Sequence, residues 1–245
     1  MPTSKPAIGQ AAGKAADVEA MFDEIAPRYD LLNRVLSFGT DVLWRKKAVR
    51  MLDAALSGAP RRLFDMATGT GDLALELLAL DPDEVVGIDI SEGMLAYGRT
   101  KVRKAGEDAR VRMIQGSADD MPGEPASFDG GTVAFGVRNF EDLQAGLRGM
   151  ARALKPGAPL VVLETSQPTA FPIKQGYRFY AQHVMPRVGG AISGTRAPYE
   201  YLPESAAQFP YGEAFLREMR AAGFTDCVAR PLTFGVASLY RGLAP

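Results

Sequence analysis

The sequence predicts an α/β protein built on a seven-stranded, mostly parallel sheet. After Pro60, short apolar runs of strand length alternate with segments of helical spacing through five units, which is typical of a parallel sheet. Near the end of the chain, two apolar runs are joined by a very short turn, at Phe224–Arg230 and Phe234–Arg241. They predict an antiparallel hairpin that completes the sheet.

The elements are expected in the following order. Apolar residues at helical spacing between Asp17 and Leu56 predict three helices before the first strand. Strands are then predicted at Arg61–Asp65, Val85–Asp89, Val111–Ile114, Gly130–Phe135 and Pro159–Glu164, with helices at Leu73–Leu80, Glu92–Lys104, Glu141–Leu154 and Glu213–Ala222. Residues 1–16 are expected to be a flexible tail, because they lack the apolar centre of a signal peptide.

Residues 17–245 are expected to form one domain, with N-terminal helices at 17–57 and an insertion at 166–212. The insertion is predicted to begin with a helix over Phe171–Val188, which is followed by an irregular stretch rich in Gly, Pro and Tyr. Its position after the fifth strand is that of a lid over a substrate.

Composition limits the classes of function. The chain has 28 basic and 29 acidic side chains, and its net charge of −1 provides no footprint for a nucleic acid. With Cys227 alone, neither an internal disulfide nor a cysteine metal site is expected. No run of about 18 apolar residues occurs, so a cytoplasmic protein without a membrane span is expected.

The clearest candidate for ligand binding is the turn Gly69-Thr70-Gly71, which follows an apolar strand and opens a helix. It lacks the third glycine of the dinucleotide pattern, and no Gly-Lys-Ser/Thr follows it. Asp89 ends the second strand about 20 residues later, where an acid accepts hydrogen bonds from ribose hydroxyls. Together these features predict a nucleoside-type ligand, whereas the turn alone is equally compatible with a structural role.

Two further turns are predicted to reach the same crevice at the carboxyl ends of the strands. Ser117 and Ala118 follow the third strand, where an adenine would lie, although the adjacent Asp119 and Asp120 are equally well explained as helix caps. Arg138 follows the fourth strand and is expected to point toward the reacting region, with a solvated surface arginine as the alternative.

Several motifs resemble one known family. They are Tyr29-Asp30-Leu31-Leu32-Asn33, Leu36-Ser37-Phe38-Gly39, Asp41-Val42-Leu43-Trp44-Arg45, Gly69-Thr70-Gly71-Asp72, Gly136-Val137-Arg138-Asn139, Leu154-Lys155-Pro156-Gly157 and Tyr201-Leu202-Pro203-Glu204-Ser205. Over about Met21 to Gly242, the chain is similar to the demethylmenaquinone and ubiquinone-biosynthesis C-methyltransferases. The resemblance implies a Rossmann-like class I methyltransferase with strand order 3-2-1-4-5-7-6 and S-adenosylmethionine as the cofactor.

The implied reaction is methylation of a ring carbon in a polyprenylated quinol, as the last step of menaquinone synthesis or a late step of ubiquinone synthesis. By matching position, Thr70, Asp89, Ser117 and Ala118 are expected to contact the cofactor, with Gly69 and Gly71 forming the turn. The chain departs from relatives at Thr68, where they often have Gly or Cys, and at Ala134, where some have a Ser that contacts the cofactor. Only the contact at Ala134 is put in doubt.

A quinol carbon becomes nucleophilic when its neighbouring hydroxyl loses a proton, so a base or a cation is expected nearby. The catalytic candidates are Arg138, to stabilise phenolate, and His183, to accept the proton unless it is a core residue. The substrate-binding candidates are Tyr29, Asn139, Tyr177 and Tyr201, although an aromatic residue at helical spacing is more often part of the core. No metal is needed for this chemistry.

A lipid substrate implies reversible, peripheral membrane contact. It is expected to be hydrophobic rather than electrostatic and to involve the helices around Met21–Phe38 and Phe171–Val188. A homodimer is compatible with the sequence. Two alternatives stay open: a scaffold that binds S-adenosylmethionine without turnover, and a methyltransferase acting on a different small acceptor.

Overall fold

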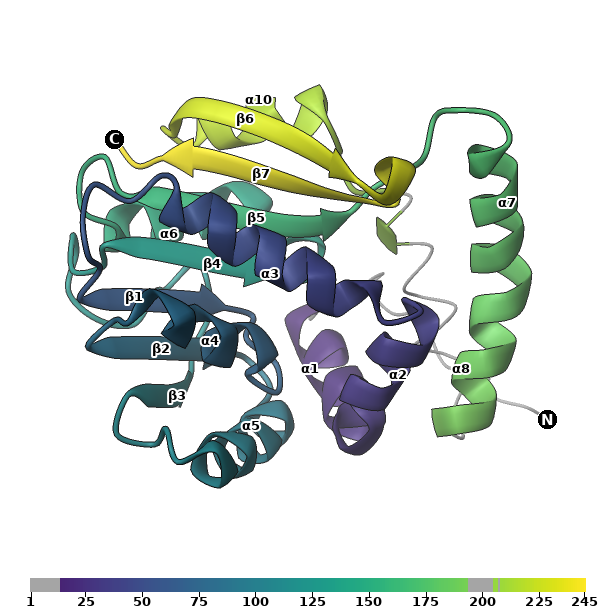
Figure 1. The fold of residues 1–245 in the computed structure, drawn as a ribbon, viewed down its shortest axis with the longest axis horizontal. Coiled ribbons are helices and arrows are strands. Elements are labelled where there is room, and N and C mark those ends of the chain that lie inside the picture. Colours follow the sequence, from purple (N-terminus) through teal and green to yellow (C-terminus); the bar gives the residue numbers. More distant parts are fainter. Residues whose placement is uncertain (1–13, 194–204, 207) are drawn as a thin grey trace.

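The computed structural model describes residues 14–193, 205–206 and 208–245, and it contains the predicted sheet. The strands are β1 (Arg62–Met66), β2 (Glu84–Asp89), β3 (Val111–Gln115), β4 (Gly130–Ala134), β5 (Pro159–Thr165), β6 (Thr225–Leu232) and β7 (Ala237–Leu243). They lie in the order β3-β2-β1-β4-β5-β7-β6 (Figure 1), which confirms the predicted topology. The first five strands are parallel, and β7 is antiparallel to both of its neighbours.

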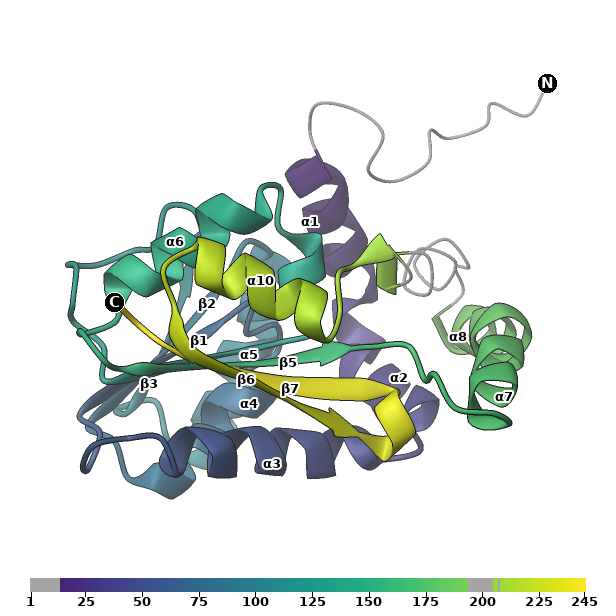
Figure 2. The same ribbon diagram turned by 90° about the horizontal axis from the view of Figure 1, so that it is seen from above.

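Helices cover both faces of the sheet, as Figure 2 shows along its edge. One face carries α3 (Thr40–Asp53), α4 (Asp72–Glu76) and α5 (Glu92–Ala105), and the other carries α6 (Leu143–Ala153) and α10 (Glu213–Ala221). Because successive strand side chains point to opposite faces, Leu63 packs under the first layer and Phe64 under the second. Both faces are therefore buried, as a parallel sheet requires.

The N-terminal helices cover the end of the sheet where the parallel strands terminate (Figure 1). Helix α1 (Lys14–Ile25) begins inside the stretch predicted to be a tail, and a 3-10 turn at Ala26–Arg28 connects it to α2 (Tyr29–Leu36). The tail boundary predicted at residue 16 is therefore too late by at least the three residues from Lys14.

The described part of the predicted insertion is mainly one long helix beyond the end of β5. It consists of α7 (Ile173–Phe179), a π-helical turn at Tyr180–Val184 and α8 (Met185–Ser193). This helix stands beside α2 in both views (Figures 1 and 2). The Tyr180 hydroxyl donates a hydrogen bond of 2.8 Å to the carbonyl of Leu36, which joins the two helices.

The predicted hairpin is present, but its second strand starts later than expected, at Ala237 rather than at Phe234. Residues Thr233–Gly235 form a 3-10 turn instead. Two side chains hold this turn: the Trp44 indole donates to the Thr233 hydroxyl at 2.8 Å, and the Ser166 hydroxyl donates to the Gly235 carbonyl at 2.8 Å. Phe234 is left exposed at the tip.

The contact between β1 and β4 yields a test of the packing. Phe64 and Gly131 are paired in register, and a Cβ atom at 131 would overlap the buried Phe64 ring. Gly131→Ala is expected to lower the free energy of unfolding by about 1–3 kcal/mol, because the ring has to leave its position. Gly58→Ala is the matched control, since nothing lies within 4 Å of its Cβ position. Equal urea midpoints for the two variants would contradict this packing.

Candidate active site

A cleft lies at the carboxyl ends of the parallel strands, which is where open α/β sheets bind ligands. Three parts of the chain line it: the N-terminal helices, the turns after β1 to β3, and the segment after β4. The lining includes Val18, Phe22, Tyr29, Gly69, Asp89, Ser117, Ala118, Ala134, Gly136, Asn139 and Gly146. Predicted residues from distant parts of the sequence are thus brought together.

Asp89 connects the end of β2 to the glycine turn after β1. Its carboxylate accepts the backbone N–H of Gly69 at 2.7 Å through one oxygen and that of Ser91 at 2.9 Å through the other. Burial raises the pKa of Asp89, and these backbone donors offset part of the rise. A carboxylate oxygen can accept more than one hydrogen bond. Asp89 can therefore still bind hydroxyl groups in the cleft.

Asp65 also holds the glycine turn, through hydrogen bonds with two threonine side chains. The Thr68 and Thr132 hydroxyls each donate to its carboxyl oxygens at 2.7 Å. Burial raises the pKa of Asp65 to about 7, even though these two hydrogen bonds oppose the rise. The threonine at 68, which departs from the usual residue of the similar family, therefore serves to anchor the turn.

Small residues form the walls of the cleft where the chain has to lie close to a ligand. A Cβ atom at Gly136 would collide with Ala67, and one at Gly146 would lie 2.5 Å from the Phe140 ring. Ser117 and Ala118 also line the cleft, where the Cβ atom of Ala118 lies 3.2 Å from the Cβ position of Gly146. The Ser117 hydroxyl donates to the carboxylate of Asp119.

Arg138, which was expected to point toward the reacting region, is not among the residues that line the cleft. Its guanidinium forms an ion pair with Glu164 of β5, and both side chains are buried, at 6% and 0% exposed. Tyr29 and Tyr177 lie within electrostatic range: burial raises the pKa of each hydroxyl, and the Arg138 charge lowers it. Arg138 and Glu164 are buried and the two tyrosines are partly buried, so these four residues form a polar group next to the cleft.

The other predicted site residues have different outcomes. His183 is exposed, stacks on the Phe179 ring at 4.9 Å and does not line the cleft. The expectation of a proton acceptor at His183 therefore loses its geometric basis. Thr70, Gly71 and Tyr177 also lie outside the lining, and Tyr201 falls outside the described residues.

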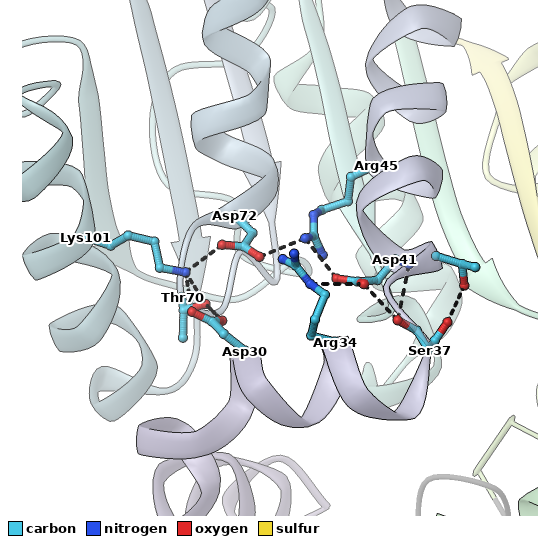
Figure 3. Close-up of polar contacts among 9 residues, drawn as sticks. Asp30, Arg34, Ser37, Asp41, Arg45, Thr70, Asp72 and Lys101 are labelled. Carbon is cyan, nitrogen blue, oxygen red and sulfur yellow. Dashed lines mark hydrogen bonds and ion pairs between the residues drawn. The ribbon is translucent and has the colours of Figure 1, made fainter.

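Thr70 belongs instead to a charged network that joins α2 and α3 to the glycine turn (Figure 3). Its hydroxyl donates to Asp30 at 2.5 Å, and the Lys101 ammonium contacts Asp30 at 2.5 Å and Asp72 at 2.6 Å. Arg45 extends the network by pairing with Asp72 at 2.9 Å. Burial alone would raise the pKa of Asp72, but the contacts with Lys101 and Arg45 bring it below its usual value.

Several site residues were missed by the sequence analysis. Asp65 and Glu164 are acids at the ends of apolar strands, and such acids are buried only when they are paired, so their positions were an available signal. Val18 and Phe22 line the cleft from α1, which the sequence alone did not distinguish from an ordinary amphipathic helix.

The strand order, the glycine turn after β1 and the acid at the end of β2 define the class of the protein as a Rossmann-like methyltransferase. The chain belongs to the ubiE/COQ5 methyltransferase family, whose sequence model matches residues 10–244. It is 46% identical over 232 residues to a demethylmenaquinone methyltransferase of Porphyromonas gingivalis, which covers 94% of each chain. It is 49% identical over 226 residues to one of Thermus thermophilus, which covers 92% of this chain and 100% of the other.

Solved structures share the fold at much lower identity. A SAM-dependent methyltransferase of Thermotoga maritima, described as a possible histamine N-methyltransferase, matches 93% of this chain and 99% of its own at a TM-score of 0.64 and 20% identity. The [4+2]-cyclase SpnF matches 98% and 99% at a TM-score of 0.68 and 16% identity. The reaction therefore has to be argued from the site rather than from the fold.

Lys101→Met tests the charged network. Removing the ammonium leaves Asp30 and Asp72 facing each other, and we expect the free energy of unfolding to fall by about 1–2 kcal/mol, less than for a fully buried pair because all three side chains are partly exposed. Lys104→Met changes an exposed lysine on the same helix and serves as the control. Indistinguishable urea unfolding of the two variants would show that the network contributes no stability.

Asp65 makes stability depend on pH. Because the folded state raises its pKa to about 7, the folded state binds this proton more tightly than the unfolded chain does. The protonated Asp65 side chain therefore makes its full contribution to the free energy of unfolding below about pH 4. This contribution, on the order of 4 kcal/mol, is lost as the pH rises through 7. Urea unfolding of the wild type and Asp65→Asn between these limits should show a difference that varies with pH. If the difference in the free energy of unfolding between the two proteins did not change with pH, Asp65 would not be the titrating group.

Proposed function

We propose that this chain methylates a ring carbon of a polyprenylated quinol with S-adenosylmethionine, converting demethylmenaquinol to menaquinol. The observation that carries the proposal is the cleft itself, which is lined by a turn suited to a nucleoside and by Tyr29, and which lies next to the buried Arg138. The names of the relatives from Porphyromonas gingivalis and Thermus thermophilus support this substrate. Another relative, from Geobacter sulfurreducens, is named a ubiquinone/menaquinone biosynthesis C-methyltransferase, which keeps a benzoquinol as the second candidate.

The lining of the cleft fits S-adenosylmethionine. Asp89 would accept hydrogen bonds from the ribose hydroxyls, Ser117 and Ala118 would flank the adenine, and Gly69 would lie against the sugar. When bound, the cofactor supplies a methyl group activated by a positively charged sulfur. The task of the protein is then to hold the ring carbon in line with that methyl and to exclude water.

The substrate end of the cleft would lie next to the polar group around Arg138. Tyr29 and Asn139 line the cleft, and the buried Arg138 precedes Asn139 in the chain, within electrostatic range of the Tyr29 and Tyr177 hydroxyls. An arginine keeps its proton, so Arg138 would stabilise the negative charge that develops on the quinol oxygen.

A lipid substrate requires contact with a membrane surface. In the described part of the chain, no helix has the length and apolar character needed to cross a bilayer. Phe171 and Phe179 are exposed on or next to α7, at 82% and 61%, and Phe38 lies 5.6 Å from the Tyr180 ring. Lys174 and Arg178 lie on the same helix, so, in place of the purely hydrophobic contact expected from the sequence, we propose peripheral contact with headgroups as well as with acyl chains.

Flotation with anionic and neutral vesicles tests this contact. The double variant Phe171→Ser, Phe179→Ser should bind vesicles less than the wild type, whereas Tyr97→Ser, an exposed aromatic residue on α5, should not differ from it. Equal flotation of both variants would show that another surface of the protein contacts the membrane.

The substrate assignment is tested in a host that lacks its own demethylmenaquinone methyltransferase. Expression of this chain should restore menaquinone at the expense of demethylmenaquinone, measured by mass spectrometry of extracted quinones. Accumulation of unmethylated quinone with a folded, expressed protein would contradict the proposal. Restoration of ubiquinone alone would favour the benzoquinol.

Asp89→Ala is expected to weaken S-adenosylmethionine binding by more than about tenfold, because hydrogen bonds to a charged group contribute about 1.5–3 kcal/mol. Asp81→Ala, an exposed acid after α4, is the control. The measurement is calorimetric titration, with melting temperatures to confirm folding. Unchanged affinity in the folded Asp89 variant would remove this carboxylate from the cofactor site.

A further inference from the structure

Glu164 is a fully buried acid at the carboxyl end of β5, immediately beside the end of β4. It follows the apolar run Pro159–Leu163, whose side chains pack into the two cores on either side of the sheet. A carboxylate is placed there only at a considerable desolvation cost. Such a residue indicates a function that an apolar side chain could not perform.

The two oxygens of Glu164 are used unequally. Oε1 accepts hydrogen bonds from the Arg138 guanidinium and from the Thr165 backbone N–H at 2.7 Å and hydroxyl at 3.1 Å. Oε2 is buried and accepts none from the described residues. An unsatisfied carboxylate oxygen in the interior is unfavourable, so this atom requires a hydrogen-bond donor.

Three charged or titratable side chains face Glu164 from neighbouring elements. They are Arg138 after β4, Tyr177 on α7 and Tyr240 on β7. The Tyr240 hydroxyl accepts the N–H of Gly212 at 2.9 Å and is also hydrogen-bonded to the Ser238 side chain. Tyr177 comes from α7. Glu164 itself does not line the cleft, but Gly136 and Asn139, on either side of Arg138, do, so a ring hydroxyl would approach Oε2 from this part of the cleft.

We propose that Glu164 is the proton acceptor of the reaction and that its Oε2 takes the proton of a quinol hydroxyl. This inference rests on the proposed function and supplies the base that His183 does not. When the proton moves, negative charge passes from the carboxylate to the ring oxygen, and both positions lie beside the same guanidinium of Arg138. The arginine therefore stabilises the charge before and after the transfer.

The protons and electrons balance as follows. The quinol O–H bond breaks, its electron pair stays with the ring oxygen, and the adjacent ring carbon becomes nucleophilic. After that carbon has gained the methyl, whose former bonding pair stays with the donor sulfur, it loses its own hydrogen as a proton to water. Glu164 then returns its proton to the ring oxygen. One proton leaves per turnover, and Glu164 is again a carboxylate.

Glu164→Gln tests the role because it keeps the size of the side chain and removes the base. With a short-chain demethylmenaquinol kept reduced under nitrogen, kcat should fall by at least about a hundredfold at neutral pH. The rate of the variant should then rise with pH toward the ionisation of the quinol, near 10 for a phenol, while the wild type levels off. A merely structural loss would lower the rate by the same factor at every pH.

A binding measurement provides a readout that does not depend on turnover. We expect 1-naphthol, which has the ring hydroxyl but is not the substrate, to bind Glu164→Gln about tenfold more weakly than the wild type, with unchanged S-adenosylmethionine affinity. Glu213→Gln, an exposed acid of α10, is the matched control and should retain both affinities and kcat. Melting curves establish that each variant is folded.

The outcomes separate this inference from the proposed function. If the wild type methylates the quinol and Glu164→Gln stays within about threefold of it at neutral pH, Glu164 is not the base and Oε2 binds only water. If the wild type itself fails to methylate any quinol, the proposed function is wrong. A folded Glu164→Gln variant with normal 1-naphthol affinity would also overturn the contact.

Discussion

Two buried carboxylates at the ends of adjacent strands hold the glycine turn, and the rest of the site depends on them. Asp65 binds the Thr68 hydroxyl, and Asp89 binds the Gly69 N–H only one residue later. The turn has left-handed backbone at Ala67, Gly69 and Gly71, so without these bonds it would not hold a single conformation. The same acids shape this end of the cleft, because Gly69 of the turn and Asp89 both line it.

Helix α2 connects the glycine turn to the lid helix formed by α7 and α8. Its second residue, Asp30, binds the Thr70 hydroxyl, and its last carbonyl, at Leu36, accepts the Tyr180 hydroxyl of the lid helix. Tyr29, the first residue of this helix, approaches Gly69, whose Cβ position is 3.7 Å from the Tyr29 ring. A change in the glycine turn therefore reaches the lid through one short helix.

The order of the sheet and the meeting of Gly69, Asp89, Ser117 and Ala118 in one cleft could be predicted from the sequence, because hydrophobic periodicity and the spacing from Gly69 to Asp89 are local signals. The substrate end could not. Arg138 was identified from its position after β4, but its partner Glu164 lies 26 residues later and meets it only because β4 and β5 are neighbours. Thr70 was assigned to the cofactor by resemblance, and only the fold shows that Asp30 and Lys101 occupy its hydroxyl. His183 has a suitable side chain but lies on the exposed face of its helix.

The cyclase SpnF has the same fold, so the topology does not determine the reaction. The reaction depends on the side chains at the ends of β4 and β5. The most direct test is to incubate the purified chain with reduced demethylmenaquinone and S-adenosylmethionine labelled with ¹³C in the methyl group. Carbon NMR of the product should show the label as a methyl on the ring carbon. Label in a methoxy group, or no transfer with a folded protein that binds the cofactor, would contradict carbon methylation of a quinol by this site.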